Sequence, residues 1–164
     1  MKKILVILFM MLPCVLFAQK HIEFMGVELG GDLDETIQEF KSKGFVEDEY
    51  GRKDVGQGFW GKWWKFDKVH IHLYAPADIG KVAECSVSLE TQLFYVEELI
   101  SNLDDKYGSH SKNKTLINTE LDWAVPEGNR IHMELYKSFV SIKYIDYPLN
   151  KQEEAKKKEA NKDL

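Results

Sequence analysis

A five-residue segment that occurs twice constrains the fold of this chain most strongly. Residues His70–Tyr74 read His-Ile-His-Leu-Tyr, and 62 positions later His132–Tyr136 read His-Met-Glu-Leu-Tyr. Both segments alternate polar and apolar side chains, which is typical of half-buried β-strands. Each follows a tryptophan-containing apolar strand and a short turn, and these apolar strands are expected at Phe59–Phe66 and Leu121–Val125. The spacing predicts two copies of one structural unit, with a period of about 62 residues.

A helix is predicted ahead of each strand pair. In the first half, Asp32 and Glu35 have the spacing of a capping box, and Gly44 suits a helix end. In the second half, apolar residues at helical spacing run up to Gly108. The apolar stripes comprise Leu33, Ile37 and Phe40 in the first helix and Val96, Leu99, Ile100, Leu103 and Tyr107 in the second.

A third strand is predicted after each pair, at Lys81–Glu90 and at Phe139–Tyr147. The chain therefore reads as helix-strand-strand-strand twice, in repeats of about 22–90 and 91–149. Two such units joined edge to edge give an α+β fold, in which one antiparallel sheet carries both helices on one face. The sequence leaves the strand order open, and it leaves the second face of the sheet to solvent or to a partner.

The remaining segments are expected to be less regular. Ile22–Leu29 is predicted to form a short extra strand, and the polar stretches Glu47–Gln57 and His110–Thr119 are predicted to be loops. Residues 150–164 are almost entirely charged, Ala or Asn, without an apolar face. They are expected to form a solvated tail, either irregular or extended as a helix.

The first eighteen residues have the layout of a secretory signal peptide. Lys2 and Lys3 precede an apolar run, Ile4–Phe17, and a cleavage point follows Ala18. This run is too short and wrongly flanked for a membrane span, so the mature chain is expected to lack a transmembrane segment and to be periplasmic or secreted. A lipoprotein would instead be cut before Cys14, but such processing favours a small residue where this chain has a proline.

Composition narrows the classes of partner. Removal of residues 1–18 from the 164 leaves 146, with a net charge of about −7 at neutral pH. An acidic surface disfavours nucleic acid and anionic lipid, which both reward clustered lysine and arginine. One cysteine, Cys85, remains in the mature chain, so an intramolecular disulfide is excluded. It is expected to be a buried apolar residue on one strand face with Ala83, Val87 and Leu89.

The two-unit layout resembles a known architecture. Tandem helix-plus-strands units resemble the β-lactamase-inhibitor-protein-like fold over most of the mature chain. The opening Phe24–Asp34, which leads into a helix ending at Lys43-Gly44-Phe45, is also similar to openings of uncharacterised secreted bacterial proteins. In that fold the open sheet face grips a protein partner, so the resemblance implies a binding role.

Strand alternation predicts which side chains lie on the open face. Trp60, Trp64 and Phe66 are assigned to the core because they form the more apolar set of their strand, with Trp64 equivalent to Trp123. The opposite set faces outward together with polar residues of the repeated strands. The candidate binding residues are Trp63, Tyr74, Arg130, Tyr136 and Lys143. Aromatic side chains with arginine are typical of protein-binding surfaces, although an amphipathic sheet also carries Tyr and His for their β-propensity alone.

A metal site on the same face is the more specific alternative to a protein-binding surface. His70 and His72 lie two residues apart on one strand, and His132 and Glu134 are their counterparts in the second repeat. These four side chains would suit a metal-dependent hydrolase if the repeated strands were neighbours. Ordinary exposed or paired histidines are the other interpretation.

Motifs for catalysis and phosphate binding are absent from the sequence, including Gly-x-Ser-x-Gly, His-Glu-x-x-His and Cys-x-x-Cys. The sequence therefore favours a non-catalytic binding module for a protein or peptide, without a cofactor. A structural subunit of a surface assembly is a further hypothesis.

Overall fold

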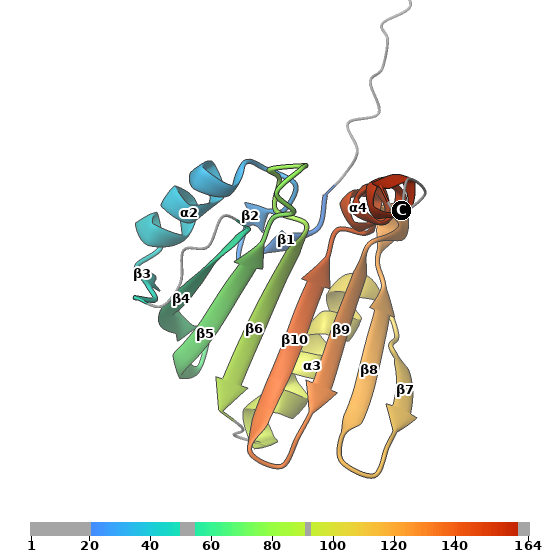
Figure 1. Ribbon diagram of the computed structural model, residues 1–164. Coiled ribbons are helices and arrows are strands. Elements are labelled where there is room, and N and C mark those ends of the chain that lie inside the picture. Colours follow the sequence, from blue (N-terminus) through green and yellow to red (C-terminus); the bar gives the residue numbers. More distant parts are fainter. Residues whose placement is uncertain (1–20, 50–54, 91–92, 161–164) are drawn as a thin grey trace, which may run out of the picture.

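The computed structural model describes residues 21–49, 55–90 and 93–160, and the predicted leader with Cys14 lies outside them. The chain forms the predicted α+β fold, with an antiparallel sheet of eight strands in the order β3-β4-β5-β6-β10-β9-β8-β7 (Figure 1). The strands of the sheet are β3 (Val46–Glu47), β4 (Gly56–Trp63), β5 (Phe66–Tyr74), β6 (Glu84–Glu90), β7 (Ser111–Lys114), β8 (Thr119–Ala124), β9 (Arg130–Leu135) and β10 (Phe139–Ile145). A separate hairpin pairs β1 (Glu23–Phe24) with β2 (Val27–Glu28), and the helices are α2 (Leu33–Ser42), α3 (Leu93–Tyr107) and α4 (Tyr147–Ala160), with a 3₁₀ turn, η1 (Pro126–Gly128).

The two repeats are joined by their last strands, β6 and β10. These strands pair antiparallel over seven residue pairs, with Val87 opposite Ile142 near the centre. On either side of the Val87–Ile142 pair, residues paired across the four central strands form a row. A half-turn rotation about that pair exchanges the two rows. One row is His70, Ser88, Ser141 and Glu134, and the other is His72, Ser86, Lys143 and His132. The rotation equates His70 with His132, so the period read from the sequence is also the period of the sheet.

Each repeat contains one strand more than the sequence predicted. The short strands β3 and β7 lie at the two edges of the sheet. β7 lies inside a segment expected to be a loop, and β3 ends at Glu47, where the other predicted loop begins. The prediction failed because every residue of these strands is exposed, so their side chains carry no alternating pattern. Short, polar edge strands of this kind protect a sheet from pairing with other chains.

Helices α2 and α3 cover one face of the sheet, as predicted. The side chain of Asp32 caps α2 by accepting hydrogen bonds from the backbone N–H groups of Asp34 and Glu35 at 2.8 and 3.3 Å. Phe40 of α2 packs on Phe59 of β4 with ring centroids 5.6 Å apart. The side of α3 that faces the sheet buries Val96, Leu99 and Leu103.

The segment expected to be one extra strand is instead a tight hairpin. Met25 and Gly26, between β1 and β2, both have positive φ angles, of 56° and 72°. This backbone suits the turn of a two-residue hairpin. The hairpin inserts Phe24 into the core, where its ring lies 4.9 Å from those of both Trp63 and Tyr144.

The C-terminal segment also differs from the expected solvated tail. Helix α4 lies across one end of the sheet (Figure 1), and Glu153 is buried there. The Glu153 carboxylate accepts a hydrogen bond from the Tyr74 hydroxyl at 2.8 Å, and Lys156 donates to the carbonyl of Asp78 at 2.9 Å. The sequence pattern missed this contact because polar side chains make it. Residues 161–164 of the predicted tail lie outside the described residues.

The predicted faces of β4 are reversed for its tryptophans. Phe59 is completely buried, whereas Trp60 is 42% exposed and points to the open side. Trp64 lies in the β4–β5 turn with a φ of 53°, and it too is 42% exposed. The register equates Gly61, not Trp64, with Trp123, because Gly61 pairs with Val69 as Trp123 pairs with Ile131. A Cβ at Gly61 would lie 2.3 Å from the Phe45 ring. The ring of Phe45, which follows α2, therefore occupies the core space at this position.

These positions predict unequal costs for two tryptophan truncations. Trp123→Ala should lower the free energy of unfolding by about 3–5 kcal/mol, because a buried ring and its hydrogen bond to Asp104 are lost. Trp64→Ala should cost about 1 kcal/mol or less, because its ring is half in water already. Urea denaturation of both variants measures the difference, and equal losses would contradict the described register.

Candidate binding face of the sheet

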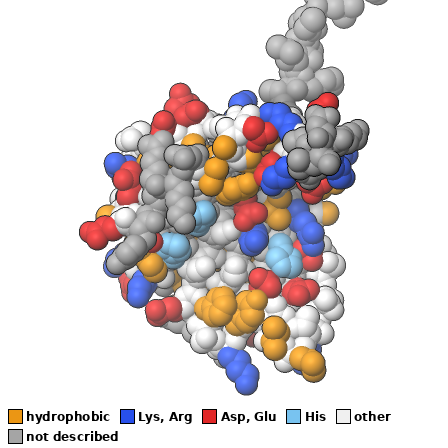
Figure 2. All heavy atoms as spheres, in the orientation of Figure 1, with side chains coloured by type: hydrophobic (Ala, Val, Ile, Leu, Met, Phe, Trp, Pro, Cys, Tyr) orange, Lys and Arg blue, Asp and Glu red, His pale blue; other side chains and the backbone are white. Residues whose placement is uncertain are grey.

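The face of the sheet opposite α2 and α3 is polar in its middle and apolar toward one end. Its centre is a floor of small hydroxyl side chains, and the strands on either side carry histidines and charged residues (Figure 2). Hydrophobic side chains gather at the lower end of the view in Figure 2. The hydroxyl floor consists of Ser86, Ser88 and Ser141.

Many charged groups of this face are paired with one another. Arg130 donates from Nε to Asp122 at 2.7 Å, and His132 Nδ1 lies 2.8 Å from the same oxygen. Partial burial opposes the charge on Asp122, but the hydrogen bonds from His132 and Arg130 outweigh it and hold the pKa of that carboxyl below its ordinary value. Lys143 lies 3.6 Å from Glu84. These charged groups therefore interact with one another within the face, and a partner would have to compete with these ion pairs.

Four of the five predicted binding residues lie on this face, and each has a partner within the chain. Arg130 and Lys143 form the ion pairs above, Tyr74 donates to Glu153, and Tyr136 donates to Glu134 at 3.0 Å. Trp63 is the exception. Its ring packs on Phe24, on the side of the sheet that α3 covers.

The four candidate metal ligands do not converge. His70 and His72 lie on β5 and His132 and Glu134 on β9, with both β6 and β10 between them. Three strand spacings separate the two pairs by roughly 14 Å, too far for one ion. Among the described residues, His, Cys, Asp and Glu side chains nowhere gather in threes at metal-binding geometry. His70 instead lies 3.3 Å from Asp48, and burial together with the charge of His70 lowers the pKa of His72.

A hollow between two exposed rings is the feature that sequence reasoning missed. Trp60 and Phe139, 42% and 41% exposed, flank a pocket of about 180 Å³ whose floor includes Ser88. Lys68 and Glu90 also line the pocket. Trp60 was assigned to the core by the sequence pattern, and Phe139 was not among the predicted binding residues. We call this site the Trp60–Phe139 hollow.

Neighbouring side chains pack against both rings of the hollow. Trp60 lies against His70 with ring centroids 4.4 Å apart, and Lys68 Nζ lies 5.5 Å from the Trp60 ring. Phe139 stacks on Tyr136 at 4.3 Å with an interplanar angle of 15°. Supported aromatic side chains lose little conformational entropy when a partner covers them.

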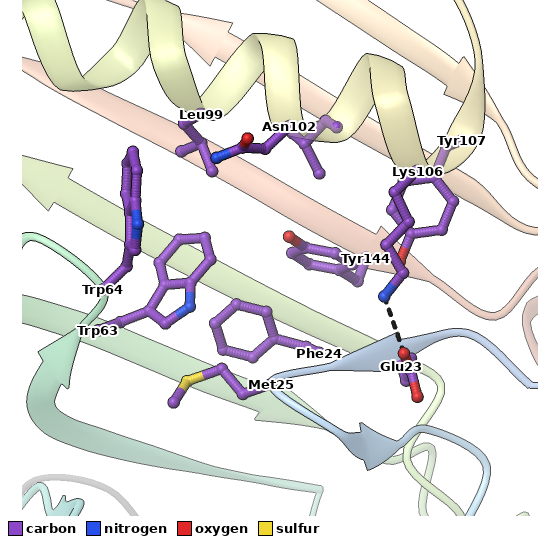
Figure 3. A pocket seen from close by; sticks show the side chains of 11 residues that line it. Glu23, Phe24, Met25, Trp63, Trp64, Leu99, Asn102, Lys106, Tyr107 and Tyr144 are labelled. Carbon is purple, nitrogen blue, oxygen red and sulfur yellow. Dashed lines mark hydrogen bonds and ion pairs between the residues drawn. The ribbon is translucent and has the colours of Figure 1, made fainter.

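A second hollow lies on the opposite side of the sheet, between α3 and the β1–β2 hairpin (Figure 3). Its volume is about 230 Å³, and it contains Trp63, the binding candidate that is absent from the open face. Other residues of its wall are Phe24, Trp64, Leu99, Lys106 and Tyr144. We call it the aromatic cleft.

Comparisons with protein families, characterised proteins and solved structures found no match to this chain. None of the helices in the described ranges combines the length and the apolar character that a membrane span requires.

The Asp122 network predicts a specific acid response. A carboxyl whose pKa is lowered by folding adds stability above its unfolded pKa of about 3.9, and this stability is lost as the pH falls through the lower, folded value. Asp122→Asn should therefore flatten the decline of unfolding free energy below about pH 4. Urea denaturation from neutral to acid pH measures the slope. Asp105→Asn, at an exposed carboxyl of α3, is the control that should retain the wild-type slope, and an unchanged slope in Asp122→Asn would contradict the network.

Proposed function

We propose that this protein is an exported, non-catalytic binding module whose open sheet face holds a protein or peptide. The Trp60–Phe139 hollow is the observation that carries the proposal. Two half-exposed aromatic rings flank it on a face whose charged groups are largely self-paired. Aromatic anchors beside a small pocket are the usual energetic centre of a protein interface.

The size and lining of the hollow indicate what it accepts. A volume of about 180 Å³ suits one apolar side chain, held between the rings of Trp60 and Phe139. Burying such a side chain contributes about 1.5–3 kcal/mol, and the covered parts of the two rings contribute more. The hydroxyl of Ser88 and the charges of Lys68 and Glu90 supply polar contacts at the rim for the partner's backbone or side chains.

Two sequence features support the same proposal. The predicted leader supports export to the periplasm or to the outside of the cell. The two-unit sheet agrees with the resemblance to the β-lactamase-inhibitor-protein-like fold, in which the open sheet face grips a protein. The residues proposed to make the contact are Trp60 and Phe139 at the centre, with Tyr136, Arg130 and Lys143 around them.

A displayed random-peptide library selected on the immobilised protein tests this proposal. Peptides should be enriched that carry an apolar or aromatic anchor, and their affinities should fall about tenfold or more for Trp60→Ala and for Phe139→Ala. Tyr147→Ala is the control, because Tyr147 is also about half exposed but lies in α4, outside both hollows. Its affinities should stay within about twofold of wild type.

Circular dichroism and urea denaturation of each variant separate lost binding from lost folding. Peptides that bind Trp60→Ala and Phe139→Ala as tightly as wild type would contradict the proposal, as would a failure to enrich any peptide.

A further inference from the structure

The aromatic cleft has the walls of a small-molecule site. Phe24 of the hairpin and Trp63 of β4 form one side, and Leu99 of α3 lies across from them (Figure 3). The ring of Phe24 lies 4.9 Å from Trp63, with an interplanar angle of 68°. Rings and aliphatic groups from separate elements thus enclose a space suited to a flat apolar group.

The strongest indication of a ligand is the hydroxyl of Tyr144. This β10 residue is only 3% exposed, and its hydroxyl points into the cleft (Figure 3). Within the described part of the chain the hydroxyl has no hydrogen-bond partner. The hydroxyl oxygen itself is open to the cleft, so a ligand or solvent there can accept its hydrogen bond. Burial raises the pKa of Tyr144 far above its ordinary value, so the hydroxyl keeps its proton and can donate.

A second donor stands at the mouth of the cleft. Lys106 Nζ of α3 lies 2.8 Å from a carboxylate oxygen of Glu23 on the hairpin (Figure 3). Both side chains are about half exposed, at 52% and 51%. Exposed ion pairs of this kind contribute little to stability, so the lysine can exchange Glu23 for another carboxylate at low cost.

We propose that the aromatic cleft binds a small aromatic carboxylate. The ring lies between Trp63, Phe24 and Leu99, and the carboxylate accepts hydrogen bonds from the Tyr144 hydroxyl and from Lys106 in place of Glu23. The volume of about 230 Å³ fits this size, because a cavity of about 150 Å³ already holds benzene. This site is separate from the Trp60–Phe139 hollow, since the sheet lies between them.

Titration with 3-phenylpropanoate tests the proposal, with 3-phenylpropan-1-ol as the uncharged probe of matched shape. Calorimetry up to about 10 mM covers weak millimolar affinities. The acid should bind at least about tenfold more tightly than the alcohol. Tyr144→Phe should weaken binding of the acid about three- to tenfold, and Lys106→Met should remove most of the preference for the acid.

Variants with matched chemistry make the result specific. Tyr147→Phe and Lys137→Met change the same residue types elsewhere and should leave the affinity within about twofold of wild type. Glu23→Gln removes the carboxylate that competes for Lys106 and should tighten binding about two- to fivefold. In NMR spectra the indole N–H signal of Trp63 should shift on binding, while those of Trp60 and Trp123 should stay in place.

Three results would overturn the proposal: no heat and no shift of Trp63 up to the highest concentration, equal affinity for acid and alcohol, or weaker binding by Glu23→Gln. None of them bears on the open face, because the signal of Trp60 reports that side independently.

Discussion

The pairing of β6 with β10 is the constraint on which the rest of this structure depends. Seven residue pairs, from Phe139 opposite Glu90 to Ile145 opposite Glu84, join two four-stranded units into one sheet. The inward residues of both strands, among them Val87 and Ile142, are fully buried under the helices. Without this pairing each unit would expose a long edge strand and half of a core, which is costly and prone to aggregation.

The same pairing determines which side chains of the two units lie close together. Joining the units at their last strands keeps the repeated strands β5 and β9 apart, so His70 and His72 do not meet His132 and Glu134. It leaves serines, not histidines, along the middle of the open face, with Trp60 and Phe139 at one end. On the helix side it places Tyr144 of the second unit beside Phe24 and Trp63 of the first, which creates the aromatic cleft.

Local signals in the sequence predicted much of the fold, and long-range packing explains where they failed. The repeated segment, the Asp32 cap and the apolar stripe of α3 have local causes, and all three were predicted correctly. On the core side of β4, the Phe45 ring occupies the space that a side chain at Gly61 would fill. The alternation of residues within one strand cannot reveal such a long-range contact. The edge strands and the buried Glu153 are held by backbone or polar contacts, so hydropathy gave no sign of them. Four of the five binding candidates lie on the open face. Trp63 lies on the helix side and Trp60 on the open side, because the predicted faces of β4 are reversed for both.

Native-state hydrogen exchange tests the central claim, that β6 and β10 unite the two repeats into one cooperative structure, most directly. Because one sheet and one core include both units, the slowest amides of β5 and β6 should open with the same free energy as those of β9 and β10. That common value should equal the global free energy of unfolding from denaturant. If the amides of one repeat exchanged at a distinctly lower free energy while the other repeat stayed protected, the repeats would be separate folding units and the account would be contradicted.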